Sequence, residues 1–357
     1  MVTISLCMIV KNEESIIERC LDSVQHVVDE INIIDTGSTD RTKEIVQNYT
    51  TRIFDFIWCD DFAKARNFSF QQATKDYTLW LDADDVLTTE YQQKLLQLKK
   101  SLNPNIDAVS MDYYVQLDED GEIEISEKRY RLVKRSRNFQ WQGAVHEFLH
   151  VKGKLFHSDV VITHLPLKKD RDRNIQIYER LMAAGHSFSA RETFHYANEL
   201  KSHQRFLEAI NHYNTFLDLD LGSAEDKIQA CLNVSDCYQH LRDSKQAIQS
   251  LLQSLLYERP SPETCCRIGH LFMEQFKNET SIYWYSQAIQ QSSTTLGTQR
   301  RAYSTWLPHL QLSKLYDRLG LYENAHEHNE AARRYKPNDK RILDNEKYLY
   351  SRLNKGK

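Results

Sequence analysis

The sequence predicts an α/β domain with a doubly wound, mainly parallel sheet, followed by an all-α domain. Up to about residue 165, short runs rich in β-branched residues alternate with amphipathic helical runs, as in βαβ units. From Arg171 onward the strand patterns stop and helical periodicity continues. A length of 357 residues also suits two domains better than one compact core. We therefore predict a first domain at residues 1–168 and a helical-repeat domain at residues 169–357.

The elements of the first domain follow one another in a regular order. Predicted strands occupy Ile4–Val10, Glu30–Asp35, Ile53–Phe56 and Tyr77–Asp82. Predicted helices between them occupy Glu14–Val24, Asp40–Tyr49 and Phe62–Thr74. Asp40 has the residue type of an N-cap. Ligands of a doubly wound sheet bind at the carboxyl ends of its strands, so the polar residues that follow these strands are candidates for a ligand site.

The second domain repeats a pattern of small and large residues. Small residues mark the expected second helix of each pair at Ala209, Ala247, Ser281 and Ala325. Further positions of the pattern are Ala197, Ser235, Gly269 and Ser313 twelve residues earlier, Leu200, Tyr238, Phe272 and Tyr316 nine residues earlier, and Tyr213, Leu251, Tyr285 and Asn329 four residues later. This spacing resembles the tetratricopeptide repeat, whose period is roughly 34 residues. A helical bundle without repeats is the alternative.

Composition argues against several classes of protein. Hydrophobic residues make up 41 % and charged residues 27 % of the chain, as in soluble globular proteins. We expect a cytoplasmic protein, because no apolar run approaches the roughly 20 residues of a membrane span and the first residues do not resemble a signal peptide. The net charge of −4 gives no reason to expect nucleic acid as a partner. Seven cysteines without zinc-site spacing indicate reduced, mostly buried thiols.

Three carboxylates follow the fourth predicted strand. The apolar residues Leu79–Leu81 lead directly into Asp82, Ala83, Asp84 and Asp85. Placing several carboxylates at a buried strand end is costly unless a positive charge compensates. Mg²⁺ or Mn²⁺ bound to a diphosphate would compensate, because these hard cations prefer oxygen ligands. An acidic turn that caps the following helix is the alternative interpretation.

Polar residues after the other strands suggest where a nucleotide would lie. Asp35 follows the second strand and could accept hydrogen bonds from a base or ribose, while Gly37 permits a tight turn. A helix-capping loop is the alternative for this stretch. Glu13 follows the first strand, at the same predicted edge. Arg66, within the third helix, could pair with a diphosphate or hydrogen-bond the base, although the spacing fits a surface arginine equally well.

Five motifs in this order resemble the family 2 glycosyltransferases, which have the GT-A fold. They are CMIVKNEE at 7–14, IDTGSTDRT at 34–42, DDFAKARN at 60–67, LWLDADD at 79–85 and WQGAVHEFL at 141–149. The resemblance covers residues 3 to about 165. It is greatest to members with tetratricopeptide repeats, a group that includes transferases of glycocins, the glycosylated bacteriocins. It implies an inverting transfer from a UDP-sugar, aided by Mg²⁺ or Mn²⁺.

The resemblance also implies roles for individual residues. The residues placed around the donor are Val10, Glu13, Asp35, Arg66, Asp82 and Ala83. Of these, Glu13 and Asp35 would bind the uridine, and Asp82 would face the ribose and the metal shell. Asp84 would be the direct metal ligand. His164, at the end of a predicted strand, best matches the later histidine ligand of many GT-A enzymes.

An inverting transfer needs a base, because the acceptor must lose its proton as it attacks the anomeric carbon. The stretch Trp141–Glu147 offers His146 and Glu147, and in a strand only one of two neighbours would face the sugar. We favour Glu147 as the base, with His146 positioning the donor or contacting the leaving phosphate. Many family members use an aspartate from a different motif, which leaves the base open. Trp141 could stack on a sugar or belong to the core.

Six basic residues lie within Lys128–Arg137. The default interpretation is the solvated face of a β-ribbon, and the alternative is a rim that steers an acidic donor or acceptor. We assign none of them a catalytic role.

The leading hypothesis is a peptide or protein glycosyltransferase, because tetratricopeptide arrays present a groove to polypeptides. The acceptor would be a serine or threonine oxygen or a cysteine sulfur, and the repeats could also form a homodimer. The alternatives are a transferase of cell-surface or lipid-linked polysaccharide and an inactive scaffold, which would need no set such as Asp82, Asp84, Glu147 and His164. A nucleotidyltransferase usually has a glycine-rich basic loop, and Cys7–Glu14 contains no glycine.

Overall fold

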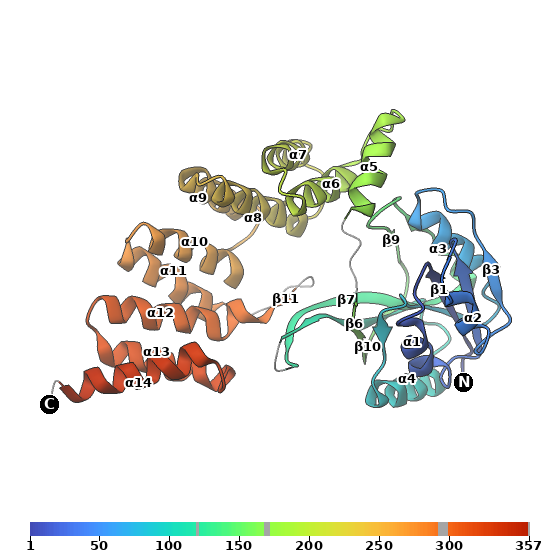
Figure 1. Cartoon of the computed structure of the whole chain (residues 1–357), viewed down its shortest axis with the longest axis horizontal. Coiled ribbons are helices and arrows are strands. Elements are labelled where there is room, and N and C mark those ends of the chain that lie inside the picture. The colour runs from blue at the N-terminus through green and yellow to red at the C-terminus, as the bar shows by residue number, and fades with distance from the viewer. Residues whose placement is uncertain (119–120, 168–171, 292–298, 356–357) are drawn as a thin grey trace. The chain divides into compact units, whose positions relative to one another are not determined.

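The computed structural model describes residues 1–118, 121–167, 172–291 and 299–355. The chain divides into two compact units, Met1–Ser187 and Phe188–Lys357 (Figure 1). The boundary predicted between residues 168 and 169 lies outside the described residues. The helix α5 (Arg173–Ala183) belongs to the first unit.

One mixed sheet with the strand order β3-β2-β1-β4-β7-β6-β10-β5 forms the centre of the first unit. The strands are β1 (Ile4–Val10), β2 (Glu30–Asp35), β3 (Ile53–Asp55), β4 (Tyr77–Trp80), β5 (Asp85–Val86), β6 (Ala108–Leu117), β7 (Ile123–Lys134) and β10 (Leu155–His164). The half formed by β3, β2, β1 and β4 is parallel, as predicted. β7 runs antiparallel to both of its neighbours, and β10 is parallel to β6 and antiparallel to β5. A separate pair of short strands, β8 (Trp141–Gln142) and β9 (Phe148–Leu149), follows β7 in the chain.

Four helices accompany the parallel strands: α1 (Ile17–Val24), α2 (Thr42–Val46), α3 (Phe62–Gln71) and α4 (Thr89–Ser101). Residues at helical spacing on α1 are buried in the core, namely Ile17, Cys20, Leu21 and Val24. The side chain of Asp61 caps α3 by accepting a hydrogen bond from the backbone N–H of Lys64 at 2.9 Å. Asp40, predicted as an N-cap, accepts a hydrogen bond from the N–H of Thr42 at 3.0 Å, but it lies one residue before the N-cap of α2, which is Arg41. Of the three helices predicted here, α3 begins at the predicted residue, Phe62, whereas α1 and α2 begin three and two residues later than predicted.

The ribbon of β6 and β7 corrects one sequence-based interpretation. The default expectation of a solvated face for Lys128–Arg137 is wrong for Arg131, which is fully buried. β7 lies between β4 and β6, so its alternate residues face the protein interior. Arg135 and Arg137, in a short 3₁₀ helix after β7, are exposed as predicted.

Helices make up nearly all of the described part of the second unit. They are α6 (Ala190–Ser202), α7 (Phe206–Asp218), α8 (Ala224–His240), α9 (Ser244–Gln253), α10 (Pro262–Glu274), α11 (Asn278–Gln290), α12 (Trp306–Arg318), α13 (Tyr322–Tyr335) and α14 (Lys340–Lys355). Two 3₁₀ turns (Ser254–Leu256 and Arg301–Ser304) and the short β11 (Gln299–Arg300) complete it. Consecutive helices pack in pairs, α6 with α7, α8 with α9, α10 with α11 and α12 with α13.

The predicted repeat pattern marks the packing positions of these pairs. Its small residues are all buried where they were placed, including Ala197 and Ala209 in the first pair and Ser313 and Ala325 in the last. Gly269 of α10 lies so close to Tyr285 of α11 that an added Cβ would be 3.1 Å from the ring. The helices are therefore tetratricopeptide-like pairs in which small residues allow close approach, as the sequence predicts.

A histidine pair joins the helices of the last such pair. The Nδ1 atoms of His309 on α12 and His328 on α13 lie 2.9 Å apart, and the ring of Tyr316 stacks on His328. Burial and then the charge of His328 lower the pKa of His309 to about 4. Burial also lowers the pKa of His328. Both rings are therefore neutral at pH 7.

Two predictions from composition can be compared with the structure. No helix in the described ranges is long and apolar enough to cross a membrane. Six of the seven cysteines are buried, and Cys59 is exposed.

Candidate active site

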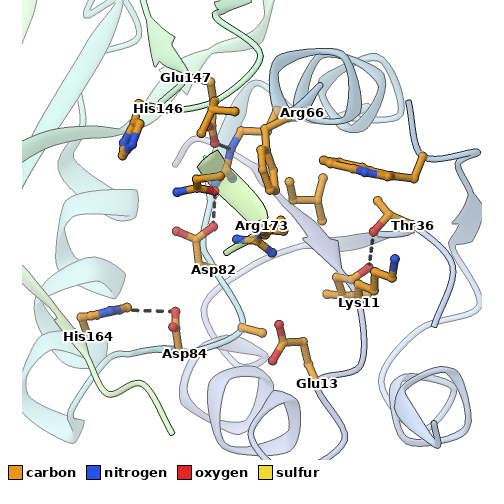
Figure 2. A pocket seen from close by; sticks show the side chains of 17 residues that line it. Lys11, Glu13, Thr36, Arg66, Asp82, Asp84, His146, Glu147, His164 and Arg173 are labelled. Carbon is orange, nitrogen blue, oxygen red and sulfur yellow. Dashed lines mark hydrogen bonds and ion pairs between the residues drawn. The ribbon is translucent and has the colours of Figure 1, made fainter. Parts of the chain in front are cut away.

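A cavity of about 340 Å³ opens at the carboxyl ends of β1 and β4, the edge at which the sequence predicts a ligand site. It brings together all the predicted site residues except Asp35, namely Val10, Glu13, Arg66, Asp82, Ala83, Asp84, His146, Glu147 and His164. Figure 2 shows His146 and Glu147 at one end of the cavity and Glu13, Asp84 and His164 at the other. Residues separated by more than 130 positions in the chain thus meet in one place.

Asp35 lies beside this cavity and does not line it. It is buried, and its Oδ1 accepts hydrogen bonds from the N–H groups of Gly37 and Ser38, each at 2.9 Å. Its Oδ2 is buried without a hydrogen-bond partner among the described residues. The next residue, Thr36, is the one that lines the cavity. The alternative interpretation, a helix-capping loop, thus accounts for the hydrogen bonds of Oδ1 but not for the burial of Oδ2 without a partner.

Asp84, Asp85 and His164 form a group that could hold a metal ion, with one ligand atom from each lying within 4.8 Å of the others. Strand pairing creates the group, because β5 places Asp85 directly opposite His164 of β10. His164 Nδ1 lies 3.3 Å from Asp84 Oδ1, and this buried nitrogen makes no well-aligned hydrogen bond to a described residue. Burial alone would lower the pKa of His164, but the two carboxylates raise it to about 9. Two carboxylates and an imidazole at this spacing are a donor set that fits Mg²⁺ or Mn²⁺.

Asp85 has a second function in this turn. Its Oδ2 accepts a hydrogen bond from the N–H of Asp82 at 2.9 Å and pairs with Arg131 Nη1 at 2.9 Å. Its Oδ1 accepts a hydrogen bond from the hydroxyl of Tyr113 at 2.9 Å. The buried guanidinium of Arg131 is itself 3.8 Å from the ring centroid of Trp80. Asp85 therefore fixes the conformation of the turn that carries Asp82 and Asp84.

Arg66 connects the two ends of the cavity. Its guanidinium pairs with Asp82 Oδ1 at 2.8 Å and with Glu147 Oε1 at 2.5 Å. It also lies 4.9 Å from the ring centroids of both Trp80 and Trp141. Burial opposes the charge of Arg66, but the two carboxylates prevail and raise its pKa. The alternative of a surface arginine is wrong, because only 8 % of Arg66 is exposed.

The segment that carries His146 and Glu147 is a loop between β8 and β9, and the strand expected there is wrong. Gly143 and His146 have positive φ angles of 94° and 51°, which a strand does not allow. Both His146 and Glu147 therefore line the cavity, where alternation along a strand would admit only one. Trp141 is 5 % exposed and packs edge-on against Trp80, so it is a core residue.

Comparison with known proteins identifies the family of this site. Residues 5–165 match the family described as Glycosyl transferase family 2. The first unit contains a family 2 glycosyltransferase domain. The match begins in β1, ends one residue after β10 and includes every predicted site residue.

Three curated relatives extend this result. The chain is 34 % identical over 149 residues to a tetratricopeptide repeat-containing protein of Synechococcus elongatus, which covers 42 % of this chain and 36 % of that protein. It is 28 % identical over 194 residues to the prophage-derived glycosyltransferase SunS of Bacillus subtilis. This alignment covers 50 % of this chain and 45 % of SunS. An uncharacterized glycosyltransferase of Rickettsia typhi is 31 % identical over 100 residues. This alignment covers 28 % of this chain and 34 % of that protein. The chain thus spans less than half the length of each of these relatives.

Solved structures similar to this chain include tetratricopeptide repeat proteins. MamA is 19 % identical and aligns with 46 % of this chain and 82 % of its own length, with a TM-score of 0.39. YrrB, described as a TPR protein with an unusual peptide-binding site, is 14 % identical over 51 % of this chain and 83 % of its own, with a TM-score of 0.37.

The cavity of the glycosyltransferase domain also contains residues to which the sequence analysis assigned no role. They are Ile9, Lys11, Thr36, Trp58, Phe62, Val145, Arg173 and Asn174. Trp58 and Phe62 meet edge-to-face with ring centroids 4.7 Å apart, and Phe62 lies within the motif DDFAKARN that contains Arg66. Arg173 and Asn174 come from α5, where no motif marks them.

Charge accumulates at the lower end of the cavity in Figure 2, where Glu13 faces Asp84. Burial and then the negative charge of Asp84 raise the pKa of Glu13 to about 7. A cavity in which the charge of a neighbouring carboxylate raises the pKa of Glu13 is suited to a cationic ligand or to a ligand that arrives with a cation.

Proposed function

We propose that this protein is an inverting glycosyltransferase that moves a sugar from a UDP-sugar to a serine, threonine or cysteine side chain of a peptide or protein, with Mg²⁺ or Mn²⁺ as cofactor. The observation that carries this proposal is the convergence of Asp82, Asp84, Glu147 and His164 on one cavity of a family 2 glycosyltransferase domain. A domain that only bound partners would gain nothing from placing these half-buried charges together.

The nucleotide half of the donor fits the ends of β1 and β2. Glu13 and Val10 line the cavity there, as does Thr36, and the preceding residue, Asp35, has one buried oxygen without a hydrogen-bond partner among the described residues. That oxygen supports a role for Asp35 in binding the base, since a buried acceptor without a partner is costly unless a ligand satisfies it. Asp82 and Ala83, which follow β4, would lie along the ribose.

Asp84 and His164 would hold the divalent cation. When bound, the cation would neutralise negative charge on the diphosphate of the leaving UDP. Asp85 is proposed as a positioning residue, because Arg131, Tyr113 and the backbone of Asp82 occupy both of its oxygens. The turn is thereby held rigid before the donor arrives.

Glu147 is proposed as the base. The acceptor oxygen or sulfur forms a bond to the anomeric carbon as the bond from that carbon to the UDP oxygen breaks, and the acceptor proton passes to the Glu147 carboxylate. Arg66 holds Oε1 of Glu147, so the carboxylate is oriented by a buried ion pair. His146, on the same loop, is the alternative base and otherwise a contact to the donor.

The polypeptide acceptor is proposed from the second unit. Tetratricopeptide-like helix pairs commonly bind extended or helical peptides, and the paired helices α6–α13 provide such an array. This supports a polypeptide acceptor over a polysaccharide, for which an array of this kind has no evident use.

The deciding experiment is intact-mass analysis of candidate peptides encoded beside this gene, after incubation with a panel of UDP-sugars and either Mn²⁺ or a chelator. We expect one peptide to gain the mass of one sugar only when metal is present. Transfer that continues undiminished in excess chelator would overturn the metal-dependent mechanism. Consumption of UDP-sugars with no modification of any peptide would overturn the proposed acceptor.

A further inference from the structure

The family 2 match ends at residue 165, but the cavity continues beyond it. Arg173 and Asn174 line the cavity and begin α5, which belongs to the first unit. The matched motifs therefore do not supply the whole site. What α5 adds is a guanidinium and an amide.

Contacts along its length fix α5 to the glycosyltransferase domain. Its buried side chains are Ile175, Ile177 and Tyr178. Arg180 pairs with both carboxylate oxygens of Asp60, at 2.7 and 2.9 Å. The guanidinium of Arg173 lies 4.7 Å from the ring centroid of Phe62, the first residue of α3. Arg173 is therefore held at the cavity by its own helix and by an aromatic ring.

Among the described residues, four acids and three lysine or arginine side chains line the cavity. Its acids are Glu13, Asp82, Asp84 and Glu147, and its permanent cations are Lys11, Arg66 and Arg173. Arg66 is buried and already paired with two of the acids. Arg173 is exposed, and its charge acts on Glu13 by opposing the burial that raises the pKa of that carboxyl. Figure 2 shows Arg173 in the middle of the cavity, at about the height of Asp82 and above Glu13.

We infer that Arg173 binds the diphosphate of the donor and stabilises the UDP leaving group, so that α5 is part of the active site although it lies beyond the family match. This inference rests on the proposed function, because it requires that the cavity takes a nucleoside diphosphate. A guanidinium donates paired, charge-assisted hydrogen bonds to phosphate oxygens, and Arg66 is not available for this role. Asn174 adds a neutral donor at the same helix start.

The test compares UDP with uridine, which shares the base and ribose but has no phosphate. Calorimetry with Mn²⁺ gives the affinity of the full chain for UDP, and ligand-observed NMR gives that for uridine. Arg173→Ala should weaken UDP binding by about tenfold to a hundredfold and change uridine binding less than about twofold. Arg173→Lys should fall between this variant and the wild type, because it keeps the charge and loses the paired geometry.

Arg41→Ala is the matched control, because it removes the same charge from an exposed arginine of the same unit that does not line the cavity. It should bind UDP as the wild type does, and the thermal unfolding temperature of every variant verifies its fold. A wild-type chain that binds neither ligand would overturn the proposed function itself. Wild-type UDP binding that Arg173→Ala leaves unchanged would overturn only the role of Arg173. Equal loss of UDP and uridine binding would do the same, by showing that Arg173 shapes the cavity and does not bind phosphate.

Discussion

Buried polar residues at the cavity of the first unit and between paired helices of the second unit serve different purposes. In the first unit the buried guanidiniums of Arg66 and Arg131 pair with acids at the edge of a cavity. In the second unit the buried polar residues include Ser281, whose hydroxyl donates to the Gly269 carbonyl at 2.7 Å, and Asn329, which donates to the Ile342 carbonyl at 3.0 Å. These uncharged groups satisfy the backbone where helices approach closely.

The difference shows how a functional region can be separated from a structural one. Burying a charge costs several kcal/mol unless a partner compensates, whereas a serine hydroxyl bonded to a nearby carbonyl costs little. Several buried ion pairs that converge on one cavity therefore indicate chemistry. On this basis, substitutions at the cavity should change turnover more than stability, and substitutions in the helix pairs should do the reverse.

The largest effect expected is that of Asp84→Ala. Loss of a direct cation ligand should lower both sugar transfer and UDP-sugar hydrolysis by about a thousandfold or more, because charge on the departing diphosphate is no longer neutralised. Rates are measured by release of UDP, and thermal unfolding should remain close to that of the wild type. Glu90→Ala, which removes an exposed acid of α4, is the control and should keep full activity. Full activity of Asp84→Ala would contradict the catalytic role inferred for the charged residues of the cavity.

Removal of the second unit tests whether that unit is needed for sugar transfer to a polypeptide but not for reaction of the donor. A chain ending at Ser187 keeps α5 and the complete cavity, so its UDP-sugar hydrolysis should stay within about twofold of the full-length rate. Transfer to the polypeptide acceptor should fall by about a hundredfold or more if the helical array binds this acceptor as proposed. The truncated protein must first be shown to be soluble and folded. If the truncated and full-length proteins glycosylated the polypeptide equally, the second unit would serve another purpose, such as self-association.

Glu147→Gln should lower transfer by about a hundredfold, because the amide keeps the shape of the side chain and cannot take the acceptor proton. UDP binding should persist, which calorimetry can verify. His146→Ala is the paired test on the same loop. If it lost turnover while Glu147→Gln kept it, the two roles would be exchanged. A thiol acceptor would reduce the effect of either change, because a thiolate needs less help from a base.

The smallest effect concerns the histidine pair of the second unit. The pKa of His309 is lowered to about 4 in the folded chain, so below pH ~6.5 the unfolded chain takes up a proton that the folded chain does not. The stability contributed by neutral His309 is full above about pH 6.5 and is lost as the pH falls toward 4. The flanking charges of Arg334 and Glu327 act in opposite directions.

His309→Gln should therefore lose about 1 kcal/mol less stability than the wild type between pH 7 and pH 5, allowing for solvent screening of a half-buried ring. Urea unfolding at the two pH values measures this difference. His270→Gln, at an exposed position of α10, is the control and should follow the wild type. An effect on UDP-sugar hydrolysis would be evidence against the separation of the two units' roles.

The parallel half of the sheet could be predicted because its signals are local. β1 and β2 have the predicted bounds, Ile4–Val10 and Glu30–Asp35, since each is a short run with several β-branched apolar residues that is followed by a polar residue. The antiparallel half was less visible, because β7 contains a charged residue, Arg131, that faces the interior. A pattern of residue types cannot show that such a charge has a buried partner such as Asp85.

The candidate site was predictable to the extent that it lies in motifs. Asp82 and Asp84 follow a strand directly, and strand pairing then brings His164 to them. Trp58 and Arg173 could not be found in this way, because tertiary packing alone brings them to the cavity. The loop conformation at His146 also depends on packing, through the hydrogen bond from the N–H of Phe62 to the Ala144 carbonyl at 2.8 Å.

Arg66 bonds to Asp82 and Glu147 at once, and this makes the two acids thermodynamically dependent on each other. Removing either acid leaves the buried guanidinium with one partner in place of two, so the second removal has a different cost from the first. Exchange of a single member of this trio between related enzymes would leave a buried charge unmatched. The three positions are expected to change together or to stay as they are, and a library that varies them one at a time would undervalue combinations that keep the charges balanced.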